Sequence, residues 1–212
     1  MSISQRRALI VIDVQNEYVT GNLVIEYPDL GTSLRNIERI AKAAQQAGIP
    51  VIVVRHNAPE DAPIFAKGSA GWQLHPIAAR LDAAHFIDKR HPSVFAGTDL
   101  RDWLQSHKID IISLVGFMTH NCLDATSREA FHEGWQVEFI HDATGSVSYA
   151  NRVGQVSAEE IHKAFIVVQQ ARFAAVLDTD EWIDNLASGH QPERDDIFHS
   201  YQNYQKYHNQ GT

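Results

Sequence analysis

The chain has 212 residues, of which 44% are hydrophobic and 21% charged, the composition of a globular protein with one domain. The formal net charge of -8 and the lack of a basic stripe disfavour a nucleic-acid-binding protein. The single cysteine, Cys122, excludes an intramolecular disulfide and fits a reducing compartment. The first apolar run, 8–12, meets Asp13 too early for a signal peptide or a membrane span. We therefore expect a cytoplasmic protein that binds neither nucleic acid nor membrane.

Apolar runs alternate with helical segments along the whole chain. Continuous or short apolar runs predict strands at 8–12, 50–54, 85–87, 109–116, 135–141 and 173–177. Apolar residues at helical spacing, with cap signals, predict helices at 30–47, 98–107, 121–133, 157–171 and 179–186. This alternation predicts an α/β fold, with helices on both faces of a parallel sheet. The irregular stretch 56–86 is long for such a domain and is expected to be functional or to contain a short helix at 74–81.

Polar residues at the carboxyl ends of the predicted strands are candidate site residues, because ligands of open α/β sheets bind there. Asp13 follows the first strand, where a carboxylate is partly desolvated; a simple turn cap explains it equally well. No glycine occurs between Asp13 and Gly21, so a phosphate-binding loop after this strand is excluded.

Cys122 and Lys89 are the other candidates. Cys122 lies at the start of a predicted helix, where the helix dipole and a nearby cation lower the pKa of a thiol. A buried structural cysteine is the alternative explanation. Lys89, taken alone, reads as an ordinary surface lysine, and its meaning depends on a position between Asp13 and Cys122.

Three segments resemble the motifs of the isochorismatase-like cysteine hydrolases. The first is the stretch 9–16, Leu-Ile-Val-Ile-Asp-Val-Gln-Asn, and the second holds Lys89, Ser93-Val94-Phe95 and Thr98-Asp99-Leu100. The third follows the family's nucleophile motif in order and spacing: Gly116, Thr119, Cys122, Thr126, Ala130, Gly134, Trp135, Val137 and Asp142-Ala143. The resemblance covers about 8–182, with departures at Phe117, where relatives often have valine or isoleucine, and at Val94, where they have alanine. It implies one three-layer α/β/α domain of Rossmann-like topology, whose six-stranded, mainly parallel sheet has the order 3-2-1-4-5-6.

The resemblance also implies a catalytic triad of Asp13, Lys89 and Cys122. In such a triad the thiolate attacks a carbonyl carbon, Asp13 takes the thiol proton and returns it to the leaving amine, and Lys89 compensates the charge. The backbone N–H groups of Met118 and Cys122 would hold the oxyanion, next to a cis peptide bond between Phe117 and Met118.

The implied activity is hydrolysis of a non-peptide C–N bond in a small amide, ureide or carbamoyl compound, through a thioester. Three alternatives remain open at this point. Isochorismatase-type cleavage of a vinyl ether needs no cysteine nucleophile. A non-catalytic relative would bind a small molecule without turnover, although all three triad residues are present. A thiol redox sensor would use Cys122 alone, although no resolving cysteine accompanies it.

The expected substrate pocket is lined by Gln15, Tyr18, His56, Trp72, Phe117 and Thr119. Trp72 suits an apolar pocket wall and the packing of its own loop equally well, and His120 suits substrate contact or a structural role. Related nicotinamidases bind a metal through an Asp-x-His pair, but the residue two before His56 is Val54. Because Asp61 and His75 offer only an unusual set of ligands, we expect no metal and no cofactor.

The C-terminal segment lies outside the resemblance. We divide the chain into a hydrolase domain, 1–188, and a tail, 189–212, in which Phe198, Tyr201, Tyr204 and Tyr207 or His208 recur at helical spacing. This aromatic helix either docks on its own domain or forms an arm across a subunit interface, where tyrosine is enriched. We expect a homodimer or homotetramer.

Overall fold

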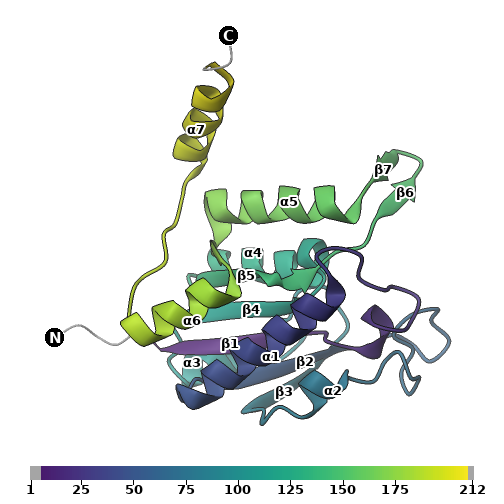
Figure 1. Cartoon of the computed structure of the whole chain (residues 1–212). Helices are drawn as coiled ribbons and strands as arrows, with labels where there is room; N and C mark the ends of the chain where they lie inside the picture. Colours follow the sequence, from purple (N-terminus) through teal and green to yellow (C-terminus); the bar gives the residue numbers. More distant parts are fainter. Residues whose placement is uncertain (1–5, 210–212) are drawn as a thin grey trace.

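The computed structural model describes residues 6–209 and the side chains of residues 6–207, and it contains one six-stranded sheet (Figure 1). The strands are β1 (Arg7–Ile12), β2 (Val51–His56), β3 (His85–Lys89), β4 (Ile111–Phe117), β5 (Gln136–Gly145) and β8 (Ala175–Leu177). Their order is β3-β2-β1-β4-β5-β8, and all five pairings are parallel. The expected order is confirmed, since β8 is the sixth strand of this sheet in chain order.

Helices cover both faces of the sheet. The helices α1 (Leu30–Gln46), α2 (Pro76–Ala79) and α6 (Thr179–Ser188) pack on one face, and α3 (Leu100–Ser106), α4 (Asp124–His132) and α5 (Ala158–Val168) on the other. Side chains of β1 alternate between the two layers: Val11 joins the core under α1, whereas Ile10 joins the core under α3 and α4. Both faces are buried, which explains why the central strands are continuous apolar runs.

Two predicted helices contain a wider turn at one end. The segment predicted as a helix over 121–133 begins with the π-helical turn η2 (Thr119–Leu123) before α4 starts, and the segment 157–171 ends in a second such turn, η3 (Gln169–Phe173). The long stretch 56–86 contains only the short helix α2, within the expected 74–81. A 3-10 turn, η1 (Asn16–Tyr18), follows β1.

A small hairpin of β6 (Tyr149–Asn151) and β7 (Gly154–Val156) was not predicted from the sequence. All six of its residues are exposed. A strand of three residues without a buried face has no alternation of apolar and polar residues from which it could be predicted.

The C-terminal helix α7 (Ile197–Asn209) stands away from the domain body in Figure 1, after an extended segment that follows α6. Its aromatic side chains are largely exposed, with Phe198 at 65% and Tyr207 at 81%. The side chain of His208 lies outside the described residues. The division at residues 188 and 189 stays a prediction. Within the described part of the chain, no helix combines the length and the apolar character needed to cross a bilayer.

Candidate active site

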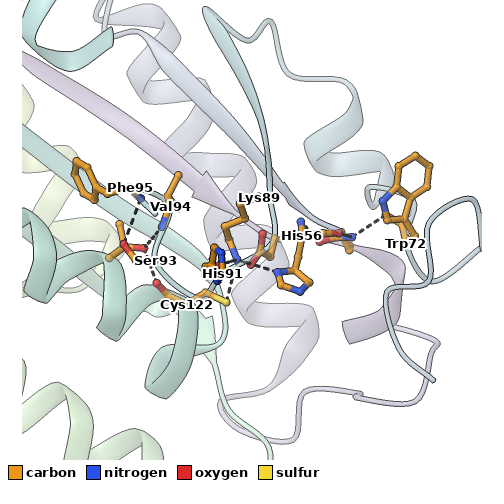
Figure 2. A network of polar contacts seen from close by, with 11 residues as sticks. His56, Trp72, Lys89, His91, Ser93, Val94, Phe95 and Cys122 are labelled. Atoms are coloured by element: carbon orange, nitrogen blue, oxygen red, sulfur yellow. Dashed lines mark hydrogen bonds and ion pairs between the residues drawn. The ribbon is translucent and has the colours of Figure 1, made fainter. Parts of the chain in front are cut away.

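The carboxyl ends of three strands bring Asp13, Lys89 and Cys122 together, and Figure 2 shows Lys89 beside Cys122. Asp13 follows β1, Lys89 is the last residue of β3, and Cys122 lies in the turn η2 after β4. The Lys89 Nζ lies 2.6 Å from Asp13 Oδ2 and 3.2 Å from the Cys122 sulfur. The Asp13 and Lys89 side chains are fully buried, and Cys122 is 4% exposed. The geometry is therefore that of one buried carboxylate, ammonium and thiol cluster.

The close approach of β4 to β1 is what allows this convergence. Gly116 has a φ of +113°, and a Cβ there would lie 2.0 Å from the carbonyl oxygen of Ile12. Only glycine fits this position, since any side chain would drive the end of β4 away from β1. Asp13, directly after Ile12, also has a positive φ of 53°, a conformation that aspartate tolerates better than most residues. The peptide bond between Phe117 and Met118 is cis.

The Lys89 ammonium has two further partners that the sequence analysis did not identify. It donates to the His91 carbonyl at 3.1 Å and lies 3.2 Å from His56 Nδ1. Burial and the Lys89 charge both lower the pKa of His56, so the imidazole is neutral and accepts from the ammonium. His56 is opposite Lys89 in the register of β2 and β3, a signal that becomes readable only once the register is known.

Asp13 retains one carboxylate oxygen with no hydrogen bond. Its Oδ1 is buried and has no hydrogen-bond partner among the residues that the structure describes. Burial alone would lower the pKa of Lys89, but Asp13 and the Cys122 sulfur outweigh this and raise it, so Lys89 is an ammonium. The cluster thus holds a fixed positive charge beside an acceptor oxygen that is free to take a proton.

The expected low pKa of Cys122 is wrong. Burial raises the pKa of its thiol to about 12, and the Asp13 carboxylate adds to this rise, while Lys89 opposes it. Cys122 also lies within a π-helical turn that precedes α4, rather than in the first turn of an α-helix, so the helix-dipole argument does not apply as stated. The resting cysteine is therefore a neutral thiol.

Aromatic side chains form a wall beside the cluster. The Tyr18 ring packs at 5.0 Å on Phe65 and at 5.5 Å on Phe117. Burial raises the pKa of Tyr18, and the neighbouring Cys122 and Asp13 side chains add to the rise. Of the predicted pocket residues, Tyr18 and Phe117 thus fit a wall, and Phe65 is an addition from the long loop.

Other predicted pocket residues are engaged elsewhere. The Gln15 amide donates to the carbonyls of His56 and Trp72 and accepts from the His56 N–H, so it ties two loops together. The Trp72 indole donates to Asn57, and the Arg55 guanidinium lies 3.8 Å above its ring, which favours loop packing over a pocket wall.

Thr119 faces away from the cluster. Its hydroxyl lies 3.0 Å from the Thr144 hydroxyl and 3.0 Å from His162 Nδ1, and the residue is fully buried. The structure therefore does not place the Thr119 side chain in the pocket; it braces the nucleophile turn against β5 and α5.

The contacts of His120 favour a structural role for this residue. Its ring nitrogens lie 3.0 Å from the Ser146 hydroxyl and 2.9 Å from the Tyr149 hydroxyl. Burial lowers the pKa of His120 to about 4, so the ring is neutral and links the nucleophile turn to the hairpin. Burial, with a smaller contribution from Cys122, raises the pKa of Tyr149, a residue near the site that had no sequence signal.

Within the described residues, one group of three side chains is close enough to share a metal ion: Asp195, Asp196 and His199, in the tail. Neither Asp61 nor His75 joins His56 in such a group.

The fold and this cluster define the class of protein. Residues 7–181 match the family described as Isochorismatase domain, and the chain belongs to this family of hydrolases. The crystal structure of a candidate isochorismatase from Burkholderia xenovorans is similar, with a TM-score of 0.95 and 51% identity over 97% of this chain and 99% of that chain.

Curated relatives include proteins with different described activities. The secreted isochorismatase effector Isc1 of Verticillium dahliae is 32% identical over 67% of this chain and 74% of its own length. Nicotinamidase 3 of Arabidopsis thaliana is 27% identical over 84% of this chain and 87% of its own length. The match therefore establishes a hydrolase family, within which substrates differ.

Proposed function

We propose that the protein is a cysteine amidohydrolase that cleaves a non-peptide C–N bond of a small amide, ureide or carbamoyl compound. The observation that carries the proposal is the buried contact of Lys89 with both Asp13 and the Cys122 sulfur, at 2.6 and 3.2 Å. A nucleophile, a base and an orienting charge within hydrogen-bond reach are the geometry of covalent acyl transfer. The relation to a nicotinamidase, which by its name acts on an amide, supports the same chemistry.

Because the Cys122 thiol is neutral at rest, its proton leaves as the sulfur attacks. Asp13 Oδ1, which has no other partner in the described chain, accepts this proton while the C–S bond forms. The carbonyl becomes an oxyanion next to the backbone N–H groups of Met118 and Cys122. When the C–N bond breaks, the leaving amine takes the proton from Asp13.

A water molecule then completes the cycle. Asp13, again a carboxylate, removes a proton from water as the oxygen attacks the thioester carbon. As the C–S bond breaks, this proton passes from Asp13 to the sulfur, which regenerates the Cys122 thiol and the Asp13 carboxylate and releases the acid product. Throughout, Lys89 keeps its charge and stabilises the carboxylate form of Asp13 between proton transfers. No other residue needs to change its charge.

Cleavage of a vinyl ether is the competing reaction, and the contact between Lys89 and the sulfur favours the covalent route instead. The test is ammonia release from a panel of primary amides, ureides and carbamoyl compounds, with the Cys122→Ala variant as control. The proposal expects at least one compound to be hydrolysed by the natural chain and not by the variant. Turnover of a vinyl ether alone, or equal amide hydrolysis by both proteins, would contradict it.

A further inference from the structure

A pocket of about 530 Å³ opens next to the buried cluster, on the side of β2 and β3. We call it the rim pocket; its lining includes His56, Asn57, Glu60, Lys67 and Arg90. His56 and Asn57 are half-buried, whereas the three charged residues are exposed, so the imidazole lies toward the inner end and the charges toward the mouth. A volume of this size lies within the range of roughly 300–1,000 Å³ that is typical of small-molecule sites.

The rim pocket is joined to the reacting sulfur through two contacts. His56 Nδ1 lies 3.2 Å from Lys89 Nζ, and Lys89 Nζ lies 3.2 Å from the Cys122 sulfur (Figure 2). The inner end of the rim pocket therefore lies within two side-chain contacts of the Cys122 sulfur.

The rim pocket carries more positive than negative charge, although the chain as a whole is negatively charged. The chain has a net charge of -8, yet the lining carries two cations, Lys67 and Arg90, and one acid, Glu60. Neither cation forms an ion pair or a side-chain hydrogen bond with any residue that the structure describes. By contrast, Arg55 nearby pairs with Asp88 at 2.8 Å. Two unpaired cations from different loops thus face one cavity.

We propose that the substrate is an amide or carbamoyl compound that carries a carboxylate, and that Lys67 and Arg90 bind this carboxylate while Cys122 attacks the other end. A guanidinium binds a carboxylate through two parallel N–H donors, and the lysine adds a second charge. The Glu60 carboxylate at the same mouth repels a second negative charge on the substrate. The site therefore favours a substrate with a single carboxylate. This inference rests on the proposed amidohydrolase function and adds the class of its substrate.

The experiment compares each acid with its own neutral ester: succinamate with its methyl ester, and N-carbamoylglycine with its methyl ester. The natural chain is expected to show a kcat/KM about tenfold higher for each acid, a preference that falls as salt is added. Lys67→Gln and Arg90→Gln should each lower kcat/KM about tenfold for the acids and far less for the esters. Glu60→Gln should raise kcat/KM for the acids severalfold, the opposite sign.

The matched control is Lys42→Gln, which removes one exposed positive charge from α1, outside the rim pocket. Lys42→Gln should change kcat/KM by no more than about twofold, both for the acids and for their esters. Equal rates for acid and ester in the natural chain would overturn the inference. So would equal losses on both compounds in Lys67→Gln and Arg90→Gln.

A binding measurement separates this inference from the proposed function. If no amide or carbamoyl compound is hydrolysed, the proposed function fails, and calorimetric titration of succinate into the natural chain and into the Lys67→Gln/Arg90→Gln double variant decides the rim pocket alone. Weaker binding to the double variant supports a carboxylate site. Equal binding, or binding to neither protein, overturns it.

Discussion

The triad end of the sheet and the helix α7 differ in what covers their side chains. Asp13 and Lys89 are fully buried and held by strands that pack on both faces, whereas Phe198 and Tyr207 on α7 are mostly exposed. Burial in the first region sets chemistry, because it raises the pKa of the Cys122 thiol. Exposure in the second region leaves an apolar surface for association. The two regions therefore predict different responses to substitution.

The largest effect is expected from Lys89→Met. This change removes one partner of a buried ion pair and leaves the Asp13 carboxylate uncompensated, which typically costs about 3–5 kcal/mol of unfolding free energy. Both hydrolysis and alkylation of Cys122 should slow, because loss of the ammonium raises the pKa of the thiol further. Urea unfolding and kcat/KM are the measurements, with the exposed Lys163→Met as control. A stability loss below about 1 kcal/mol would contradict the buried-pair account.

Asp13→Asn should move two rates in opposite directions. Hydrolysis should fall by about 10²–10⁴, because no base accepts the thiol proton. Alkylation of Cys122 by iodoacetamide at neutral pH should become faster, because removal of the carboxylate takes away a charge that raises the pKa of Cys122, and the charge of Lys89 remains. The exposed Asp88→Asn serves as control. Slower alkylation in Asp13→Asn would show that the carboxylate promotes the thiolate at rest.

The natural chain should react slowly with iodoacetamide at neutral pH. With the pKa of Cys122 raised to about 12, the thiolate fraction and the alkylation rate should rise about tenfold per pH unit between pH 7 and 10. Stopped reactions analysed by intact mass give this profile. A plateau near pH 8.5 would mean that the thiol titrates like a free cysteine and that burial does not control it.

The smallest effect on chemistry is expected in the tail. We predict that the chain is a homodimer or larger and that α7 contributes to the interface, because an isolated helix of this length is marginal in water without cover on its apolar side. Deletion of 190–212, or Phe198→Ser with Tyr201→Ser, should reduce the oligomer while kcat/KM per chain changes less than about twofold. Light scattering measures the mass. A monomeric full chain contradicts the oligomer, and an intact oligomer after deletion contradicts the role of α7.

The sequence predicted the fold well because its central strands and helices carry strong local patterns. The run 8–12 and the helix 30–47 became β1 and α1 within one residue at each end. Contacts that depend on strand register, such as His56 with Lys89, could not be predicted from spacing. The hairpin of β6 and β7 lacked any buried position that would have marked it.

The candidate site was predicted in its residues but not in its electrostatics. Cys122 was expected to be a thiolate from its place before a helix, yet the pKa of a thiol depends on how deeply the fold buries it. Gln15, Trp72 and Thr119 were expected in the pocket. In the structure Gln15 and Trp72 form hydrogen bonds within the loops, and Thr119 contacts α5, and none of these contacts can be seen in the sequence. Motifs thus identify side chains that meet in the fold more readily than they identify the charge states of those side chains.

The most direct test of covalent catalysis by Cys122 is to quench the reaction with the best substrate in acid within its first turnovers and measure the intact mass. The account predicts an acyl adduct on the natural chain, located on the peptide that contains Cys122. Cys122→Ala should fold, carry no adduct and lose hydrolysis. Full hydrolysis by Cys122→Ala would exclude the thioester and contradict the central claim.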